Sequence, residues 1–141
     1  MKVFEAMTPN VVSVPPEATI REAAQLMKQL DIGPLPVCDD GRLVGMLTDR
    51  DITLRATAEG LDPKSTPVVD VMTPEVICCF DTDEVEQAAL LMQEAQLRRL
   101  VVINDDRRPV GVVSLSDIVL QTGDQRLAGQ TLEGISDSPE R

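Results

Sequence analysis

The chain has 141 residues, 43% of them hydrophobic, and a formal net charge of −11 at pH 7, which suits one domain or two small halves with a common core. An acidic chain without Lys/Arg clusters lacks the charge pattern of nucleic-acid-binding proteins, and no apolar run approaches the roughly 18 residues that span a bilayer. Residues 1–6 also lack the apolar core of a secretory signal, so we expect a cytoplasmic protein that binds neither nucleic acid nor membrane.

The sequence contains two copies of one pattern. Met7-Thr8-Pro9 recurs as Met72-Thr73-Pro74, and many apolar positions that follow recur with nearly the same shift. Two copies are too few for a solenoid, which needs about three or more repeats to bury a continuous core. A packed pair with related clefts instead favours binding over catalysis. We expect a first repeat at 1–60, a linker at 61–67, a second repeat at 68–124 and a C-terminal tail at 125–141.

In each repeat an extended segment leads into an amphipathic helix. After residues 11–14, Thr19-x-x-Glu22 is typical of a capping box at the start of a helix. In the second copy the extended segment is 76–80, and Asp83-x-x-Glu86 begins the helix. The predicted apolar stripes comprise Ile20, Ala23, Ala24, Met27 and Leu30 in the first helix, and Val85, Ala88, Ala89 and Met92 in the second.

A hairpin and a second helix complete each repeat. Strands are expected at 35–38 and 43–47 around the turn 39–41, and at 100–103 and 110–113 around 104–106. Their nearly continuous apolar runs are typical of strands buried on both faces. Each hairpin leads into a helix that begins at Thr48 or Ser114. The tail from Gly123 onward is polar, and a short helix and a frayed end are both compatible with it.

The motif Gly-x-x-Thr/Ser-x-x-Asp ends both hairpins, as Gly45–Asp51 and Gly111–Asp117. One interpretation is structural: the hydroxyl caps the helix and the Asp completes a capping box. We favour an additional ligand role because Asp is shorter than the usual Glu and should reach back less easily. A hydroxyl-capped helix N-terminus also suits a phosphate, and an Asp one turn inside can accept both hydroxyls of a ribose. Capping and binding are compatible.

These motifs, in this order over residues 2–122, resemble a tandem pair of CBS domains (cystathionine-β-synthase-type repeats), as in small stand-alone bacterial CBS-pair proteins. The resemblance implies an α/β fold, a pseudo-two-fold pair of β-α-β-β-α repeats packed through their sheets. It also implies two clefts that bind adenosine-containing ligands such as AMP, ADP, ATP or S-adenosylmethionine. A homodimer that senses such a ligand and regulates a further, unknown protein is the function it predicts.

Carried over by position, the resemblance predicts a ligand site in each repeat. Asp51 and Asp117 take the ribose hydroxyls, and Thr48 and Ser114 lie near the phosphate. The base pocket is lined, largely through backbone groups, by Val12, Ser13, Gly33, Pro34, Leu35 and Pro36 in the first repeat and by Ile77, Cys78, Arg99, Leu100 and Val101 in the second. Arg50 and Arg99 are candidates for phosphate contacts, with a solvated basic edge as the alternative.

The two clefts are not expected to be equivalent, because their flanking residues differ. Pro34 of the first repeat corresponds to Arg99 of the second, and Asp49-Arg50 corresponds to Leu115-Ser116. If Arg99 faces its cleft, the site around Asp117 is the better candidate for a polyphosphate.

Other functions compete with this prediction. A dimerising scaffold with vestigial clefts would bind no nucleotide. Catalysis is disfavoured because the chain has no histidine and no cysteine has a basic neighbour in sequence. Cys38, Cys78 and Cys79 lack CxxC spacing, so burial is favoured over zinc binding or a redox role. No cofactor is expected, except Mg²⁺ bound to ATP.

Overall fold

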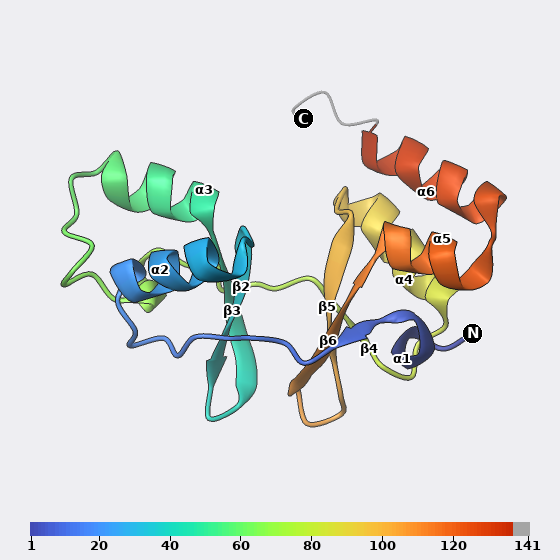
Figure 1. The fold of residues 1–141 in the computed structure, drawn as a ribbon, viewed down its shortest axis with the longest axis horizontal. Coiled ribbons are helices and arrows are strands. Elements are labelled where there is room, and N and C mark those ends of the chain that lie inside the picture. Colours follow the sequence, from blue (N-terminus) through green and yellow to red (C-terminus); the bar gives the residue numbers. More distant parts are fainter. Residues whose placement is uncertain (137–141) are drawn as a thin grey trace. The chain divides into compact units, whose positions relative to one another are not determined.

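The computed structural model describes residues 1–136, and these residues belong to two compact units (Figure 1). The first-repeat unit is Val12–Val76, and the second-repeat unit joins Met1–Val11 to the chain from Ile77 onward. The first-repeat unit contains α2 (Ile20–Leu30), β2 (Pro34–Asp39), β3 (Arg42–Thr48), α3 (Asp49–Asp51), a π-helical segment (Ile52–Thr57) and a 3-10 turn (Val68–Asp70). The second-repeat unit contains α1 (Val3–Ala6), β1 (Thr8–Pro9), β4 (Cys78–Phe80), α4 (Val85–Ala95), β5 (Arg99–Ile103), β6 (Pro109–Ser114), α5 (Leu115–Thr122) and α6 (Gln125–Ser136). The predicted α/β class is confirmed.

The second-repeat unit is built on a sheet with the strand order β1-β6-β5-β4. β6 pairs antiparallel with both β1 and β5, and β4 pairs parallel with β5. At the β1 edge, Thr8 lies opposite Val112 and Pro9 opposite Gly111. This edge strand therefore comes from the first copy of Met-Thr-Pro, at the other end of the chain.

The first-repeat unit repeats this arrangement in a reduced form around the antiparallel β2–β3 hairpin. Single bridges flank the hairpin, from Val14 to Val37 on one side and from Met46 to Thr73 on the other. Met46 and Thr73 exchange two backbone hydrogen bonds, of 2.9 and 2.8 Å. Each hairpin is thus completed by the Met-Thr-Pro segment of the other copy, across the repeat boundaries that the motifs predict along the chain.

Both predicted hairpins are present, and their turns follow from local side chains. Asp40 and Gly41 have φ values of 52° and 76°, and two consecutive positive φ angles are the requirement of a two-residue type I′ turn. The second hairpin has a longer loop, in which Asn104 Oδ1 accepts the N–H groups of Asp106 and Arg108 at 3.0 and 3.1 Å. These bonds fix the loop between β5 and β6.

The caps of helices α2 and α4 differ from the prediction. Thr19 caps α2 by accepting the Glu22 N–H at 3.2 Å, but along the described chain Glu22 returns no bond, so the capping box is half formed. The prediction that Asp83 begins α4 was wrong by one residue. Glu84 is the cap, and its N–H donates to Gln87 at 2.8 Å. Asp83 instead accepts the Phe80 N–H at 2.9 Å, which closes the preceding turn.

The predicted apolar stripe is fully buried in α4 but only partly in α2, where Ala24 and Leu30 are exposed against the prediction. The reason is α6, which packs against α4 and α5 and buries Thr131 and Ile135 (Figure 1). α2 has no such cover within its own unit. The tail therefore forms a helix as far as Ser136, and its last residues, 137–141, lie outside the described part. No described helix is long and apolar enough to cross a membrane.

Candidate functional site

The first motif brings Thr48, at the end of β3, together with Asp51 in the first turn of the following helix. Thr48 Oγ1 accepts the Asp51 N–H at 3.0 Å, and Asp51 Oδ2 accepts the Thr48 N–H at the same distance. The two residues form a complete capping box, which satisfies two N–H groups that the helix itself leaves unpaired.

The second motif has the same geometry at the start of α5. Asp117 N–H donates to Ser114 Oγ at 3.0 Å, and Ser114 N–H donates to Asp117 Oδ2 at 2.9 Å. The expectation that aspartate reaches back less easily was therefore wrong in both repeats. The extended backbone of the cap residue, with φ −117° and ψ 162° at Thr48 and φ −112° and ψ 163° at Ser114, brings its N–H within reach of the shorter side chain.

Each motif keeps chemistry that the capping box does not use. Only Oδ2 of each carboxylate enters the box, so Oδ1 of Asp51 and of Asp117 can accept further hydrogen bonds. Each capping hydroxyl accepts a backbone N–H through its oxygen and can still donate its own hydrogen. A pair of hydroxyls on a ribose, or a phosphate oxygen, could use these groups without dismantling the cap.

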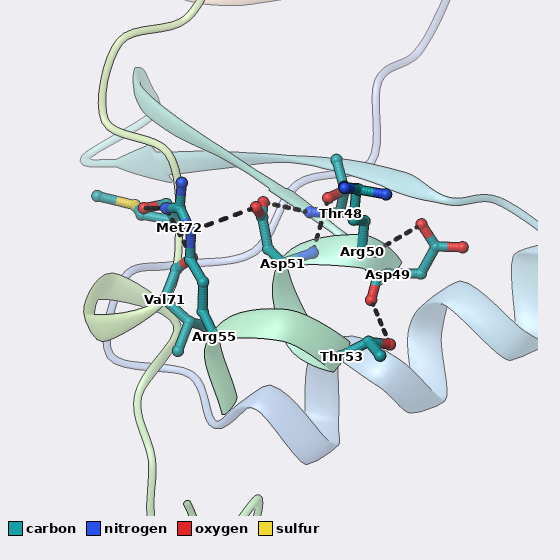
Figure 2. Close-up of polar contacts among 8 residues, drawn as sticks. All are labelled: Thr48, Asp49, Arg50, Asp51, Thr53, Arg55, Val71 and Met72. Carbon is teal, nitrogen blue, oxygen red and sulfur yellow. Dashed lines mark hydrogen bonds and ion pairs between the residues drawn. The ribbon is translucent and has the colours of Figure 1, made fainter. Parts of the chain in front are cut away.

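Arg55 joins the first motif to a distant segment, and this role was not predicted from the sequence. Its Nε lies 3.8 Å from Asp51 Oδ1, and its Nη1 donates to the carbonyl oxygens of Val71 at 3.4 Å and Met72 at 3.2 Å (Figure 2). The spacing of four residues from Asp51 is the available sequence signal, since such a pair lies on one helix face. The contacts to residues 71 and 72 have no local signal.

The other predicted residues of the first repeat lie in strand β2, in the segments that precede it, or in the first turn of the helix. Pro34 is opposite Thr48, and the Asp49 N–H donates to the Gly33 carbonyl at 3.2 Å. Val12 and Ser13 are exposed and precede Val14, which pairs on the far side of β2. The side chains of Leu35 and Pro36 are buried, so a ligand could reach only their main chain. Arg50 is exposed in the first turn of the helix.

In the second repeat, Arg99 lies directly opposite Ser114 in the antiparallel β5–β6 pair. Directly opposite residues present their side chains on the same face of a sheet, so Arg99 and the Ser114 hydroxyl share a face. Cys78 lies opposite Val101, and Ile77 is exposed just before it. Leu100 and Val101 are buried, which again leaves only their backbone groups for a ligand.

The two motifs receive positive charge from different elements. In the first repeat, Arg50 and Arg55 come from the helix, while Gly33 and Pro34 at the start of β2 are uncharged. In the second repeat the corresponding strand start carries Arg98 and Arg99, and the Leu115 N–H donates to the Arg98 carbonyl at 2.9 Å. The two sites therefore differ in where a charged ligand group would meet a cation.

The cysteines are free and largely buried. Burial raises the pKa values of the Cys38 and Cys78 thiols, and it raises the pKa of Cys79 to about 12. A raised thiol pKa leaves little of the reactive thiolate at neutral pH. Within residues 1–136, no group of three or more His, Cys, Asp or Glu side chains is placed to hold a metal ion.

Comparison with known proteins decides the family. The family model for the CBS domain matches twice, at residues 3–56 and 68–121, which together make up most of the chain. The chain belongs to the CBS-domain family. Among its relatives, the CBS domain-containing protein YhcV of Bacillus subtilis (strain 168) is 44% identical over 134 residues, a region that covers 95% of this chain and 94% of YhcV. The recognition of two tandem CBS domains from the sequence is confirmed.

Solved structures of other CBS proteins share the fold. Hypoxic Response Protein I with two coordinated zinc ions gives a TM-score of 0.78 at 36% identity, covering 86% of this chain and 98% of that one. CBSX2 in complex with AMP gives 0.72 at 29% identity, covering 89% and 98%. The CBS domain pair of protein MJ0100, in complex with 5-methylthioadenosine and S-adenosyl-L-methionine, gives 0.73 at 28% identity, covering 89% and 98%.

Proposed function

We propose that this protein is a non-catalytic regulatory module that binds adenosine-containing ligands at its two Gly-x-x-Thr/Ser-x-x-Asp motifs. The observation that carries the proposal is the carboxylate oxygen that each motif leaves outside its capping box, on Asp51 and Asp117. AMP, 5-methylthioadenosine and S-adenosylmethionine, which two structurally similar CBS proteins bind, have in common adenine and a ribose ring with its 2′- and 3′-hydroxyls. A carboxylate that accepts ribose hydroxyls recognises that common part.

In this proposal the remaining site residues hold the base and the phosphate. The hydroxyls of Thr48 and Ser114 donate to a phosphate oxygen while their oxygens continue to cap the helix. The base is held by main-chain groups, because the candidate side chains in β2 (Leu35 and Pro36) and in β5 (Leu100 and Val101) are buried. These groups come from Val12, Ser13 and Gly33–Pro36 in the first repeat, and from Ile77, Cys78 and Arg99–Val101 in the second.

The second site is the better candidate for a polyphosphate such as ADP or ATP. Arg99 shares a sheet face with Ser114, and a guanidinium forms bidentate contacts to phosphate. In the first repeat the corresponding residue is the uncharged Pro34, and Arg50 is the nearest candidate for a phosphate contact. Mg²⁺ would then enter the second site with ATP. Arg99→Gln should weaken ATP binding more than adenosine binding.

A sensor must also transmit occupancy to another molecule. We propose that the protein works as a homodimer in the cytoplasm and regulates a separate protein. Ligand binding then shifts the population of conformations in proportion to its differential affinity for them.

Thermal unfolding against a ligand panel tests the proposal. The panel comprises AMP, ADP, ATP with and without Mg²⁺, and S-adenosylmethionine. A ligand at about 100 times its Kd adds roughly 2.7 kcal/mol of stability, which raises the Tm by a few degrees for a chain of this size. We expect a selective rise that Asp51→Asn and Asp117→Asn each reduce.

The alternative is a dimerising scaffold with vestigial clefts. Its support is the completeness of both capping boxes, which gives the Thr/Ser and Asp residues a structural reason to be present. A scaffold would show no Tm change with any ligand of the panel, and the two Asn variants would then affect only helix stability.

A further inference from the structure

Arg55 occupies a central position in the first-repeat unit. It is the fourth residue of the π-helical segment Ile52–Thr57, where Ala58 N–H bonds back five residues to the Thr53 carbonyl at 2.9 Å. From there its guanidinium reaches Asp51 on one side and the carbonyls of Val71 and Met72 on the other, as Figure 2 shows. One side chain therefore links the motif carboxylate to a segment that lies 16 and 17 residues after Arg55 in the chain.

The segment that Arg55 reaches is itself bound to the strand that carries the motif. Met72 N–H donates to the Val68 carbonyl at 3.0 Å, and the next residue, Thr73, exchanges two hydrogen bonds with Met46 of β3. Met46 lies two residues before Thr48. Asp51 is thus connected to its own strand by two routes. One is the capping box with Thr48, and the other runs through Arg55 and residues 72–73 to β3.

We propose that Arg55 is a positioning residue of the first-repeat site, which holds the Asp51 carboxylate in the orientation that accepts a ribose. This inference rests on the proposed function, and it adds a residue and a role that the motif does not contain. The guanidinium is engaged by protein groups at both Nε and Nη1. In this proposal Arg55 orients Asp51 through Nε while Nη1 is held by the two carbonyl oxygens, and the ligand phosphate is assigned to other residues.

The second repeat provides an internal comparison. The residue four positions after Asp117 is Gln121, which is exposed and cannot form an ion pair. The helix there, α5, is a regular α-helix over Leu115–Thr122. Among the described residues, no cation forms an ion pair with Asp117, so a change at Arg55 should affect the first site alone.

The test uses Asp117→Asn protein, in which only the first site is intact, and compares it with the same protein carrying Arg55→Gln. Gln is the residue that the second repeat has at this position. Arg21→Gln is the matched control, since Arg21 is an exposed cation of α2 in the same unit and its side chain forms no hydrogen bond or ion pair with the described residues. Calorimetric titration with adenosine and with AMP gives the Kd of each ligand.

We expect Arg55→Gln to weaken both ligands by the same factor, roughly two- to fivefold, because Arg55 is about half exposed and exposed ion pairs are weak. Arg55→Lys should recover part of the loss, and Arg21→Gln should cause none. An equal Kd with and without Arg55→Gln would overturn the proposal. So would a loss for AMP but not for adenosine, which would make Arg55 a phosphate ligand.

A second readout separates this inference from the proposed function. Amide hydrogen exchange of the ligand-free protein should be faster at Met46 and Thr73 in Arg55→Gln than in Arg21→Gln, because residues 71 and 72 lose their hydrogen bonds to Arg55. If neither adenosine nor AMP binds, the proposed function fails at this site and the ribose-orienting role fails with it. Unchanged exchange at Met46 and Thr73 would show that Arg55 does not stabilise the pairing of residues 72–73 with β3, and it would overturn the proposal whatever the binding result.

Discussion

Met72 packs against Gly45, in the space that a side chain at position 45 would occupy. A Cβ at Gly45 would lie 2.5 Å from Met72 Sδ, and in the second-repeat unit a Cβ at Gly111 would lie 2.5 Å from Met7 Sδ. The glycine of one repeat and the methionine of the other copy's Met-Thr-Pro are therefore partners. This contact explains why the two motifs recur together in the sequence.

Alanine at these glycines should destabilise the protein. At Gly111 the new Cβ would also lie 2.8 Å from the Thr8 carbonyl oxygen, whereas at Gly45 the Thr73 carbonyl oxygen is 3.1 Å away. Overpacking of this kind costs about 1–3 kcal/mol, and Gly111→Ala should cost more because backbone cannot move aside easily. Urea unfolding measures the loss. Gly129→Ala in α6 is the control, since nothing lies within 4 Å of its Cβ, and it should stabilise the helix by about 0.5–1 kcal/mol.

Acid should loosen the attachment of the N-terminal segment to α4. The hydrogen bond from Lys2 and then that from the α-amino group hold the pKa of Glu84 below its ordinary value of 4.5. A lowered carboxyl pKa contributes stability that is present above pH 4.5 and lost as the pH falls through the folded-state pKa. Stability measured from pH 6 to pH 3 should therefore fall less steeply in Glu84→Gln than in the wild type.

The three thiols should react slowly in the folded protein. Alkylation requires the thiolate, and the raised pKa values, about 12 for Cys79, keep the thiols protonated at pH 8. Mass spectrometry after a short exposure to iodoacetamide should show little labelling of native protein and three labels in urea, with half-buried Cys78 reacting first. Rapid modification of one cysteine in the native protein would instead indicate an activated thiol and would support a redox role for that cysteine.

The C-terminal helix should contribute to stability through its buried face. Ile135 is 3% exposed in the core beneath α6, so Ile135→Ala should lower the free energy of unfolding by about 2–5 kcal/mol. Leu132, on the same helix, is 42% exposed, and Leu132→Ala should change stability by only about 0.5 kcal/mol. Equal effects of the two changes in chemical denaturation would show that α6 is not docked on α4.

Local signals predicted the elements well. Asp40-Gly41 predicted the first hairpin because few other residues adopt two consecutive positive φ angles, and Thr48 and Ser114 predicted the starts of the helices after the hairpins. The start of α4 was displaced by one residue because Asp83 and Glu84 can both act as caps. Asp83 instead accepts the Phe80 N–H in the preceding turn, and local sequence rules do not predict this contact.

Long-range pairing was beyond such signals. Nothing within residues 1–60 indicates that Met7-Thr8-Pro9 joins β6 of the second repeat. Local patterns likewise do not indicate that α6 packs on α4, where Ala89 is buried while its counterpart Ala24 in α2 is exposed. The π-helical turns that place Arg55 beside Asp51, Val71 and Met72 likewise depend on tertiary contacts. The motif residues of the candidate site were predicted from the repeat, whereas the contacts of Arg55 with residues 71 and 72 have no local sequence signal.

In the function proposed for this protein, adenosine-containing ligands bind at two separable sites. Isothermal titration of AMP into the wild type, Asp51→Asn and Asp117→Asn tests it most directly, with circular dichroism to show that each variant is folded. We predict two sites per chain in the wild type and one in each variant. A folded wild type that binds none of AMP, ADP, ATP and S-adenosylmethionine, or variants that keep both sites, would rule out adenosine binding at these two motifs.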